Sequence, residues 1–205
     1  PRGPMAAPGS YTVSLERRRL GVTIRVAGPV AFEVEPLAAT TLTAPDRLAL
    51  VAFLRQASAL QRAVLGTSVL IGQTLERVAL LKTAIDHSSA PDSSCADEAR
   101  RIERELEKLQ IELAGDRAVA RRNEPVPPSL ADRAGYIVEV QWSSTSAPTG
   151  TCRRQYELAS QNLAALLARL RPLLEHDLPA LESRLDAISA AWTPGRIPVW
   201  PPDAS

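Results

Sequence analysis

The chain has 205 residues, of which 45% are hydrophobic and 23% are charged, with a formal net charge of +1. This length fits one globular domain, or one domain and a fragment, and the apolar content excludes a disordered chain. The balanced charge argues against a nucleic-acid partner, because dedicated binders carry an excess of Lys and Arg.

Other function classes lack the residues that they need. Two histidines and two cysteines leave almost no material for a metal site, and we expect no cofactor. No stretch of about 18 uninterrupted apolar residues occurs, so we predict no transmembrane segment. The residues alone do not indicate a reaction.

Residues 1–38 are predicted to be extended. Apolar residues alternate with polar ones, which is typical of half-buried strands, in three runs: Tyr11, Val13 and Leu15; Val22, Ile24 and Val26; Phe32 and Val34. We expect Arg17–Arg19 at a hairpin tip and a second turn at Gly28-Pro29. Two or three strands cannot bury a face by themselves, so we interpret this segment as the C-terminal strands of a truncated β-sandwich whose other strands lie upstream. The alternative is that these strands pack on the helices that follow.

Residues 39–191 are predicted to form a helical bundle. Its first helix is expected from a cap at Thr43 to about His87, because Pro45 suits the first turn and Asp46 favours the positive helix end. One apolar column repeats every seven residues: Leu50, Ala57, Val64, Ile71, Val78 and Ile85. Small residues interrupt the middle of this helix at Gly66, Thr67, Ser68 and Gly72. They favour a close crossing of two helices over a hinge or a small ligand niche.

Two shorter helices follow. Ser94–Asp97 is a predicted cap, and the second helix carries an apolar stripe at Ile102, Leu106, Leu109 and Leu113. We interpret its charged face as solvated: Arg101, Arg104, Glu105 and Lys108. Ser129 and Asp132 predict the cap of a helix that reaches Trp142, although residues 136–142 also have a strand-like composition.

The last helix is expected to begin near Ala147–Thr149 and to continue a buried column for many turns. Pro172 and Pro179 lie inside it and predict a bend, with Asp177 capping a restarted segment. Residues 192–205 are expected to be an irregular tail rich in Pro and Trp, with Trp192 or Trp200 packing back.

Short loops between capped helices favour a mainly α fold, an antiparallel bundle of about four helices in up-down-up-down order. In that order Cys95 and Cys152 open helices at the same end of the bundle. A disulfide between them is therefore feasible, and two free thiols are the alternative.

Candidate catalytic groups are few. Glycoside hydrolysis needs two carboxyl groups facing each other across about 5–10 Å. Glu175 and Asp177 beside His176 are the obvious pair. We interpret them as a cap and a solvated turn, because no second acid or oxyanion donor is evident. No catalytic, cofactor-binding or metal-binding residue is therefore assigned.

Three short motifs carry a family resemblance. They are Gly3–Leu15, which reads Gly-Pro-Met-x-x-Pro-Gly-x-Tyr-Thr-Val-x-Leu, then Ala147–Thr149 and Asp177–Leu181. With the order of the helices, they resemble the C-terminal region of bacterial BNR-repeat proteins, the sialidase-like or sortilin-like β-propellers often described as glycosyl hydrolases. The tail from Trp192 is longer than in that family, and no Asp-box repeat occurs here.

The resemblance implies that a β-propeller and the rest of an Ig-like β-sandwich precede these residues in one polypeptide, and that residues 1–38 are the last strands of that sandwich. Any glycosidase site would then lie outside this chain, and the protein would be secreted, periplasmic or part of the cell envelope. Three functions stay open: a non-catalytic accessory module, a helical interaction or dimerisation module, and a contributor to a glycosidase active site.

Overall fold

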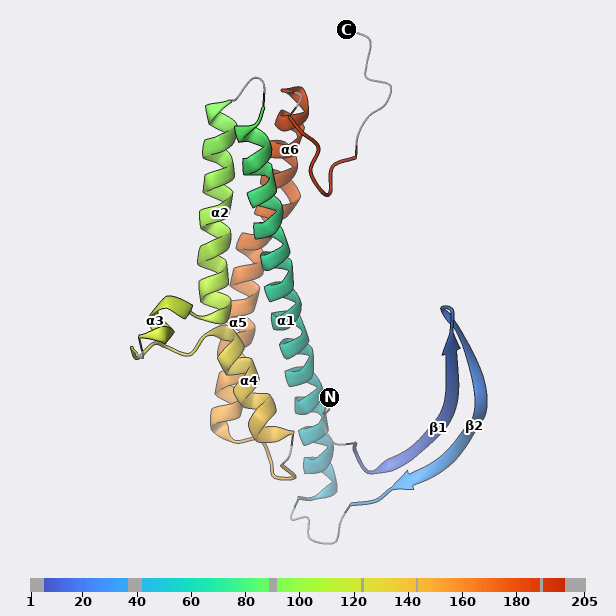
Figure 1. The fold of residues 1–205 in the computed structure, drawn as a ribbon. Coiled ribbons are helices and arrows are strands. Elements are labelled where there is room, and N and C mark those ends of the chain that lie inside the picture. Colours follow the sequence, from blue (N-terminus) through green and yellow to red (C-terminus); the bar gives the residue numbers. More distant parts are fainter. Residues whose placement is uncertain are drawn as a thin grey trace.

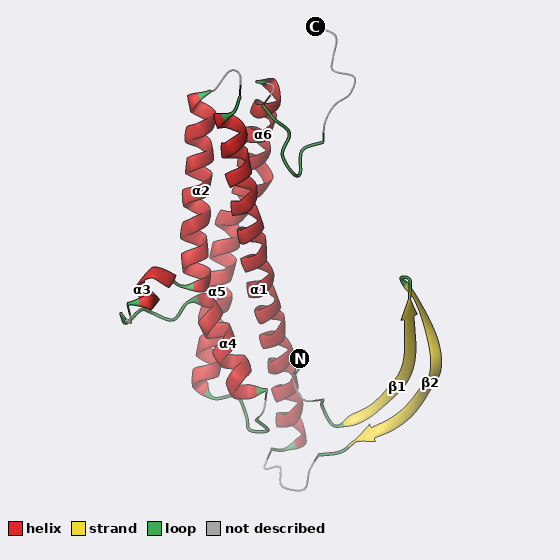
Figure 2. Cartoon of the chain, viewed as in Figure 1, coloured by secondary structure: helices red, strands yellow, loops and turns green. Residues whose placement is uncertain are grey.

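The computed structural model describes residues 6–36, 42–88, 92–122, 124–142, 144–188 and 190–197. These residues are mainly helical and include one two-stranded antiparallel sheet. Figures 1 and 2 show an elongated body of helices lying along one another, with a curved hairpin to one side. Residues 1–5, which include the start of the motif Gly3–Leu15, and Trp200 lie outside the described residues.

The sheet is one hairpin of β1 (Gly9–Arg19) and β2 (Val22–Val34). Its turn is at Leu20 and Gly21, which both have the positive φ that two-residue hairpin turns require. Arg17–Arg19 therefore lie within β1, and the prediction of a tip there is wrong. Gly28-Pro29 does not reverse the chain either. The register shifts beside it, so β2 accommodates extra residues as bulges and continues.

Helix α1 (Ala44–Asp86) confirms the first predicted helix. Its cap is Thr43, whose hydroxyl oxygen accepts a hydrogen bond from the Asp46 amide at 3.4 Å. All six residues of the predicted column are buried: Leu50, Ala57, Val64, Ile71, Val78 and Ile85. The seven-residue period therefore identified the face that packs.

The small residues of α1 do not mark a close crossing with any described part of the chain. A Cβ atom added at Gly66 or Gly72 would meet no atom within 4 Å. Glycine inside a helix costs about 1 kcal/mol relative to alanine, and no close approach within the described chain explains it. Thr67, in contrast, is buried and donates its hydroxyl to the Ala63 carbonyl at 2.8 Å.

Helix α2 (Ser93–Ala114) begins at the cap Asp92, slightly earlier than predicted, and buries the whole predicted stripe. The short helix α3 (Arg117–Arg121) follows. Helix α4 (Leu130–Gln141) has the capping box of Ser129 and Asp132, which confirms a helix rather than a strand.

The direction of α4 differs from the expectation. Figure 1 shows that α4 continues in the direction of α2, toward the end of the body where α1 begins, so the order is not up-down-up-down. The cause is the connection between α2 and α4, which consists of α3 and an extended segment containing Pro125, Pro127 and Pro128. The chain leaves the helical body along this connection and returns to it, but its direction along the body does not change.

Three segments run end to end along the remaining side: α5 (Gly150–Pro172), the π-helical η1 (Leu173–Asp177) and α6 (Leu178–Ala187). Thr149 caps α5 through the Cys152 amide at 3.2 Å, as the Ala147–Thr149 motif predicts. The two prolines do not stop the helix, because η1 follows Pro172 with wider turns and Pro179 falls in the first turn of α6. Asp177 makes no capping hydrogen bond, so its predicted role as a cap is wrong.

Burial predicts the cost of truncating this core. Ile102 of α2 is fully buried, and Ile102→Ala should lower the free energy of unfolding by about 2–4 kcal/mol. Ile111 of the same helix is 48% exposed, so Ile111→Ala should cost well under about 1 kcal/mol. Urea unfolding followed by circular dichroism measures both. Equal losses for the two variants would contradict this packing.

Candidate functional site

The two candidate acids of the last helix pair with different arginines. Glu175 Oε1 lies 3.4 Å from Arg171 Nη1, one turn away on the same helical rod. Asp177 Oδ2 lies 2.5 Å from Arg101 Nη2 of the neighbouring helix α2. Each carboxylate thus faces a different guanidinium, whereas glycoside hydrolysis needs two carboxyl groups that face each other. The geometry therefore supports a structural role for both acids.

Arg101 connects α2 to η1, and the interpretation of its face as solvated missed this contact. Besides Asp177, its guanidinium donates to both carboxylate oxygens of Glu98, at 2.9 and 2.6 Å. These hydrogen bonds lower the pKa of Glu98 and raise the pKa of Arg101. Seventy-six residues separate Arg101 from Asp177, so no local pattern could have shown the pair.

A second polar cluster caps the start of α2. The Asp92 carboxylate accepts hydrogen bonds from the Ser94 hydroxyl (2.6 Å), the Ser94 amide (2.8 Å), the Cys95 thiol (3.4 Å) and Arg184 (3.2 Å). The Ser94 hydrogen bonds hold the pKa of Asp92 well below its usual range. Burial and then the Asp92 contact raise the pKa of Cys95. Cys95 thus stays a protonated thiol at neutral pH, unlike a catalytic nucleophile.

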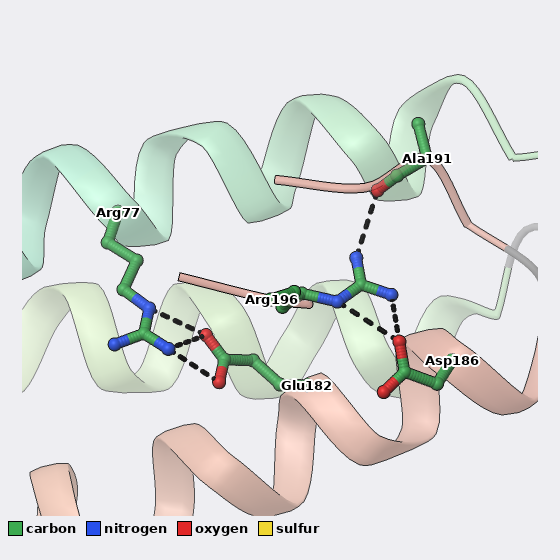
Figure 3. A network of polar contacts seen from close by, with 5 residues as sticks. All are labelled: Arg77, Glu182, Asp186, Ala191 and Arg196. Atoms are coloured by element: carbon green, nitrogen blue, oxygen red, sulfur yellow. Dashed lines mark hydrogen bonds and ion pairs between the residues drawn. The ribbon is translucent and has the colours of Figure 1, made fainter. Parts of the chain in front are cut away.

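A third group of polar contacts lies around α6 and the segment that follows it. Figure 3 shows that Arg77 of α1 donates hydrogen bonds to both carboxylate oxygens of Glu182, at 2.6 and 2.7 Å. Arg196 donates to Asp186, and to the Ala191 carbonyl at 2.9 Å. Its guanidinium also lies 4.9 Å from the centre of the Trp192 ring, which remains half-exposed. The Arg77–Glu182 pair therefore joins α1 to α6, and the Arg196 contacts hold the end of the described chain against α6.

A hollow of about 700 Å³ lies among the end of α2, α3, the start of α4 and α5. Its charged lining residues already have partners. Asp116 and Asp132 cap helices, Glu112 pairs with Arg169 at 2.8 Å, and Arg133 donates to Gln155 at 2.6 Å. No group of three potential metal-ligating side chains occurs within the described ranges.

The two cysteines are free, and the expectation that they share one end is wrong. Cys95 follows the loop after α1, whereas Cys152 packs with Phe53, near the start of α1, and with Ile137 of α4. They therefore lie at opposite ends of a long body (Figure 1). The reason is the direction of α4, which moves the start of α5 to the far end.

In contrast to the paired charges, two apolar surfaces are not covered by any residue that the structure describes. Tyr11 pairs with Phe32 across the hairpin and Val13 with Val30, on one face. Val13 is 56% and Val30 61% exposed. The second surface is the side of α1 opposite its buried column, where Leu65 and Val69 are nearly 60% exposed.

By length and composition alone, α1 could also cross a membrane. The mean hydropathy of its most apolar 18-residue stretch is 1.3, and one third of that stretch is buried inside the protein. Core helices of water-soluble proteins share these properties, so this is weak evidence against the sequence-based expectation.

No protein-family model matches the chain, and comparison with curated proteins and with solved structures finds no match.

The separation of the cysteines predicts two free thiols. Titration of the denatured, unreduced protein with a thiol reagent should find two reactive groups per chain. In the folded protein both should react slowly, because both side chains are buried. A denatured chain with no reactive thiol would contradict this arrangement.

Acid should destabilise the helical body through Glu98. Arg101 holds the pKa of Glu98 below the ordinary 4.5 in the folded chain. The unfolded chain then binds more protons in this range, so stability falls as the pH falls from about 5 to about 3. Glu98→Gln should flatten the dependence of the melting temperature on pH. Glu107→Gln is the control, because Glu107 is exposed and forms no ion pair in the described part of the chain. Equal slopes for the two variants would contradict the Arg101 contact.

Proposed function

We infer that this chain is a non-catalytic accessory module of a larger bacterial BNR-repeat β-propeller protein. Its hairpin completes a β-sandwich contributed by the same polypeptide, and its helical body supports or spaces the larger enzyme or receptor. Such a protein is secreted, periplasmic or attached to the cell envelope. The uncovered apolar face of the hairpin is the observation that carries this proposal.

The hairpin has the alternating pattern of a sheet with one buried face, but no described residue packs against that face. Tyr11 and Phe32 stack with ring centres 5.9 Å apart, and Val13, Val30 and Leu15 continue the same face. An isolated two-stranded hairpin is marginal in water. Covering its apolar face would stabilise it by about 25 cal/mol for each Å² removed from water. A packed second sheet is the ordinary solution for such a face.

The outer edges of the hairpin also favour a β partner. In the described residues β1 pairs only with β2, so each strand has one edge without a strand beside it. Exposed edges are the usual sites at which further strands add. The strand β1 contains Tyr11–Leu15, the part of the motif that resembles the end of a sandwich in the BNR-repeat proteins.

Two other functions have weaker support. A contribution to a glycosidase site would need Glu175 or Asp177, and each of these is held by an arginine. A helical interaction module is favoured by the uncovered side of α1, which does not conflict with an accessory role.

The proposal predicts which substitution in the hairpin lowers the melting temperature of the parent protein. Phe32→Ser should lower the melting temperature of the parent protein, because Phe32 would be buried by the added strands. Ala31→Ser, one residue away on the opposite face, should have a much smaller effect. In the 205-residue chain alone, Phe32→Ser should leave the melting of the helical body unchanged. Scanning calorimetry distinguishes the two transitions, and a parent protein indifferent to Phe32→Ser would contradict the proposal.

A second prediction concerns catalysis. If the parent protein cleaves a glycoside, Glu175→Gln should leave its turnover within about twofold of the original, because the side chain only pairs with Arg171. A loss of a hundredfold or more in a variant that stays folded would favour the catalytic alternative.

A further inference from the structure

The side of α1 that faces away from the helical body has a regular pattern. Residues one heptad apart lie in a column diametrically opposite the buried one, and all are exposed: Leu48, Arg55, Arg62, Val69, Glu76 and Thr83. Leu65, Gly66, Gly72 and Gln73 lie beside the middle of this column on the helical projection. We call the surface formed by Arg62, Leu65, Gly66, Val69, Gly72, Gln73 and Glu76 the outward face.

The outward face is apolar at its centre and charged at its two ends. Residues 63–75 contain no Asp, Glu, Lys or Arg. Leu65 and Val69, at the centre, are 58% and 59% exposed. In the described structure nothing covers these side chains, so water contacts an apolar strip that runs for about two turns between Arg62 and Glu76.

The two glycines allow a close approach from outside. A Cβ at Gly66 or Gly72 would meet no atom within 4 Å, so packing inside the chain does not require either glycine. Small residues on an exposed helix face let a second backbone approach closely. The crossing of two helices predicted from these residues therefore has room to occur between molecules.

The charges at the ends are opposite and unpaired. Arg62 and Glu76 make no hydrogen bond or ion pair with any residue that the structure describes. Elsewhere on α1, Arg77 pairs with Glu182 and Lys82 with Glu103. Arg62 and Glu76 are 14 residues apart, roughly 21 Å along the axis, and cannot neutralise each other.

The pattern is symmetric about Val69. Arg62 and Glu76 are seven residues on either side of it, and Gly66 and Gly72 are three. An antiparallel second helix related by a two-fold axis at Val69 would place Arg62 opposite Glu76 of the second copy. It would also place Gly66 opposite Gly72 of that copy. A parallel pair would instead place like charges opposite each other, which is unfavourable.

We propose that a second copy of this chain docks antiparallel on the outward face of α1, with the two-fold axis at Val69 and two Arg62–Glu76 ion pairs. This interface is isologous, as in most homodimers. One pair of crossing helices buries less than the roughly 1,200–2,000 Å² of stable complexes, so the dimer is weak, with a dissociation constant of about 1 µM or above. The proposal is independent of the accessory role, which concerns the hairpin.

Charge reversal in the 205-residue chain tests the register. Sedimentation velocity from about 5 to about 500 µM should show a monomer–dimer equilibrium for the original chain. Arg62→Glu and Glu76→Arg should each raise the dissociation constant tenfold or more. The double variant Arg62→Glu/Glu76→Arg should restore it, because both pairs re-form with reversed sign. Arg55→Glu, on the same column outside the predicted pairs, is the control and should change the constant less than threefold.

Gly66→Ala supplies a second readout with a matched control. It should raise the melting temperature of dilute monomer, as should Gly135→Ala in α4, whose surroundings are equally open. Only Gly66→Ala should weaken the dimer. The proposal is overturned if the chain stays monomeric throughout the concentration range, or if neither single charge reversal changes the dissociation constant of the dimer. So does binding of the monomer to vesicles of phosphatidylcholine and phosphatidylglycerol that is lost in Val69→Asp, since lipid would then cover the outward face.

Discussion

Burial of one apolar column along α1 is the interaction on which the rest of the molecule depends. The helix has 43 residues and is roughly 60 Å long, too long for the 22-residue α2 to cover. The column therefore packs on α2 near its end, and on α4 near its start, where Phe53 and Ala57 meet Ile137. The column of α1 is thus covered by α2 and α4 in tandem on one side, and by α5, η1 and α6 in tandem on the other.

The local features of the fold could be predicted because their causes are local. Thr43, Ser129 and Thr149 each satisfy amides within three residues, and the apolar period of α1 depends on the geometry of one helix. The direction of α4 could not be predicted in the same way, since it depends on the path of a proline-rich connection. Arg101 and Asp177 meet only because separate helices pack together. At the hairpin, three arginines suggested an exposed tip, but the positive φ at Leu20-Gly21 places it one residue later.

Polar and apolar groups are used differently in this molecule. The prominent charges in the candidate clusters either join one helix to another through ion pairs, as Arg77–Glu182 and Arg101–Asp177 do, or cap a helix start through hydrogen bonds, as Asp92 does with Ser94. Large apolar side chains, in contrast, remain exposed on the hairpin and on α1. This distribution favours contact with other protein surfaces over chemistry on a small substrate, and it supports the accessory role and a second copy on α1 for separate reasons.

The central claim is that the helical body holds itself together through the α1 column while the hairpin contributes nothing to it. Amide hydrogen exchange on the 205-residue chain, resolved by residue, tests this most directly. Amides around Val64, Ile71 and Val78 should open only with global unfolding, and those of β1 and β2 should exchange with almost no protection. Equal protection in the hairpin and in α1, or weak protection along the column, would contradict the account.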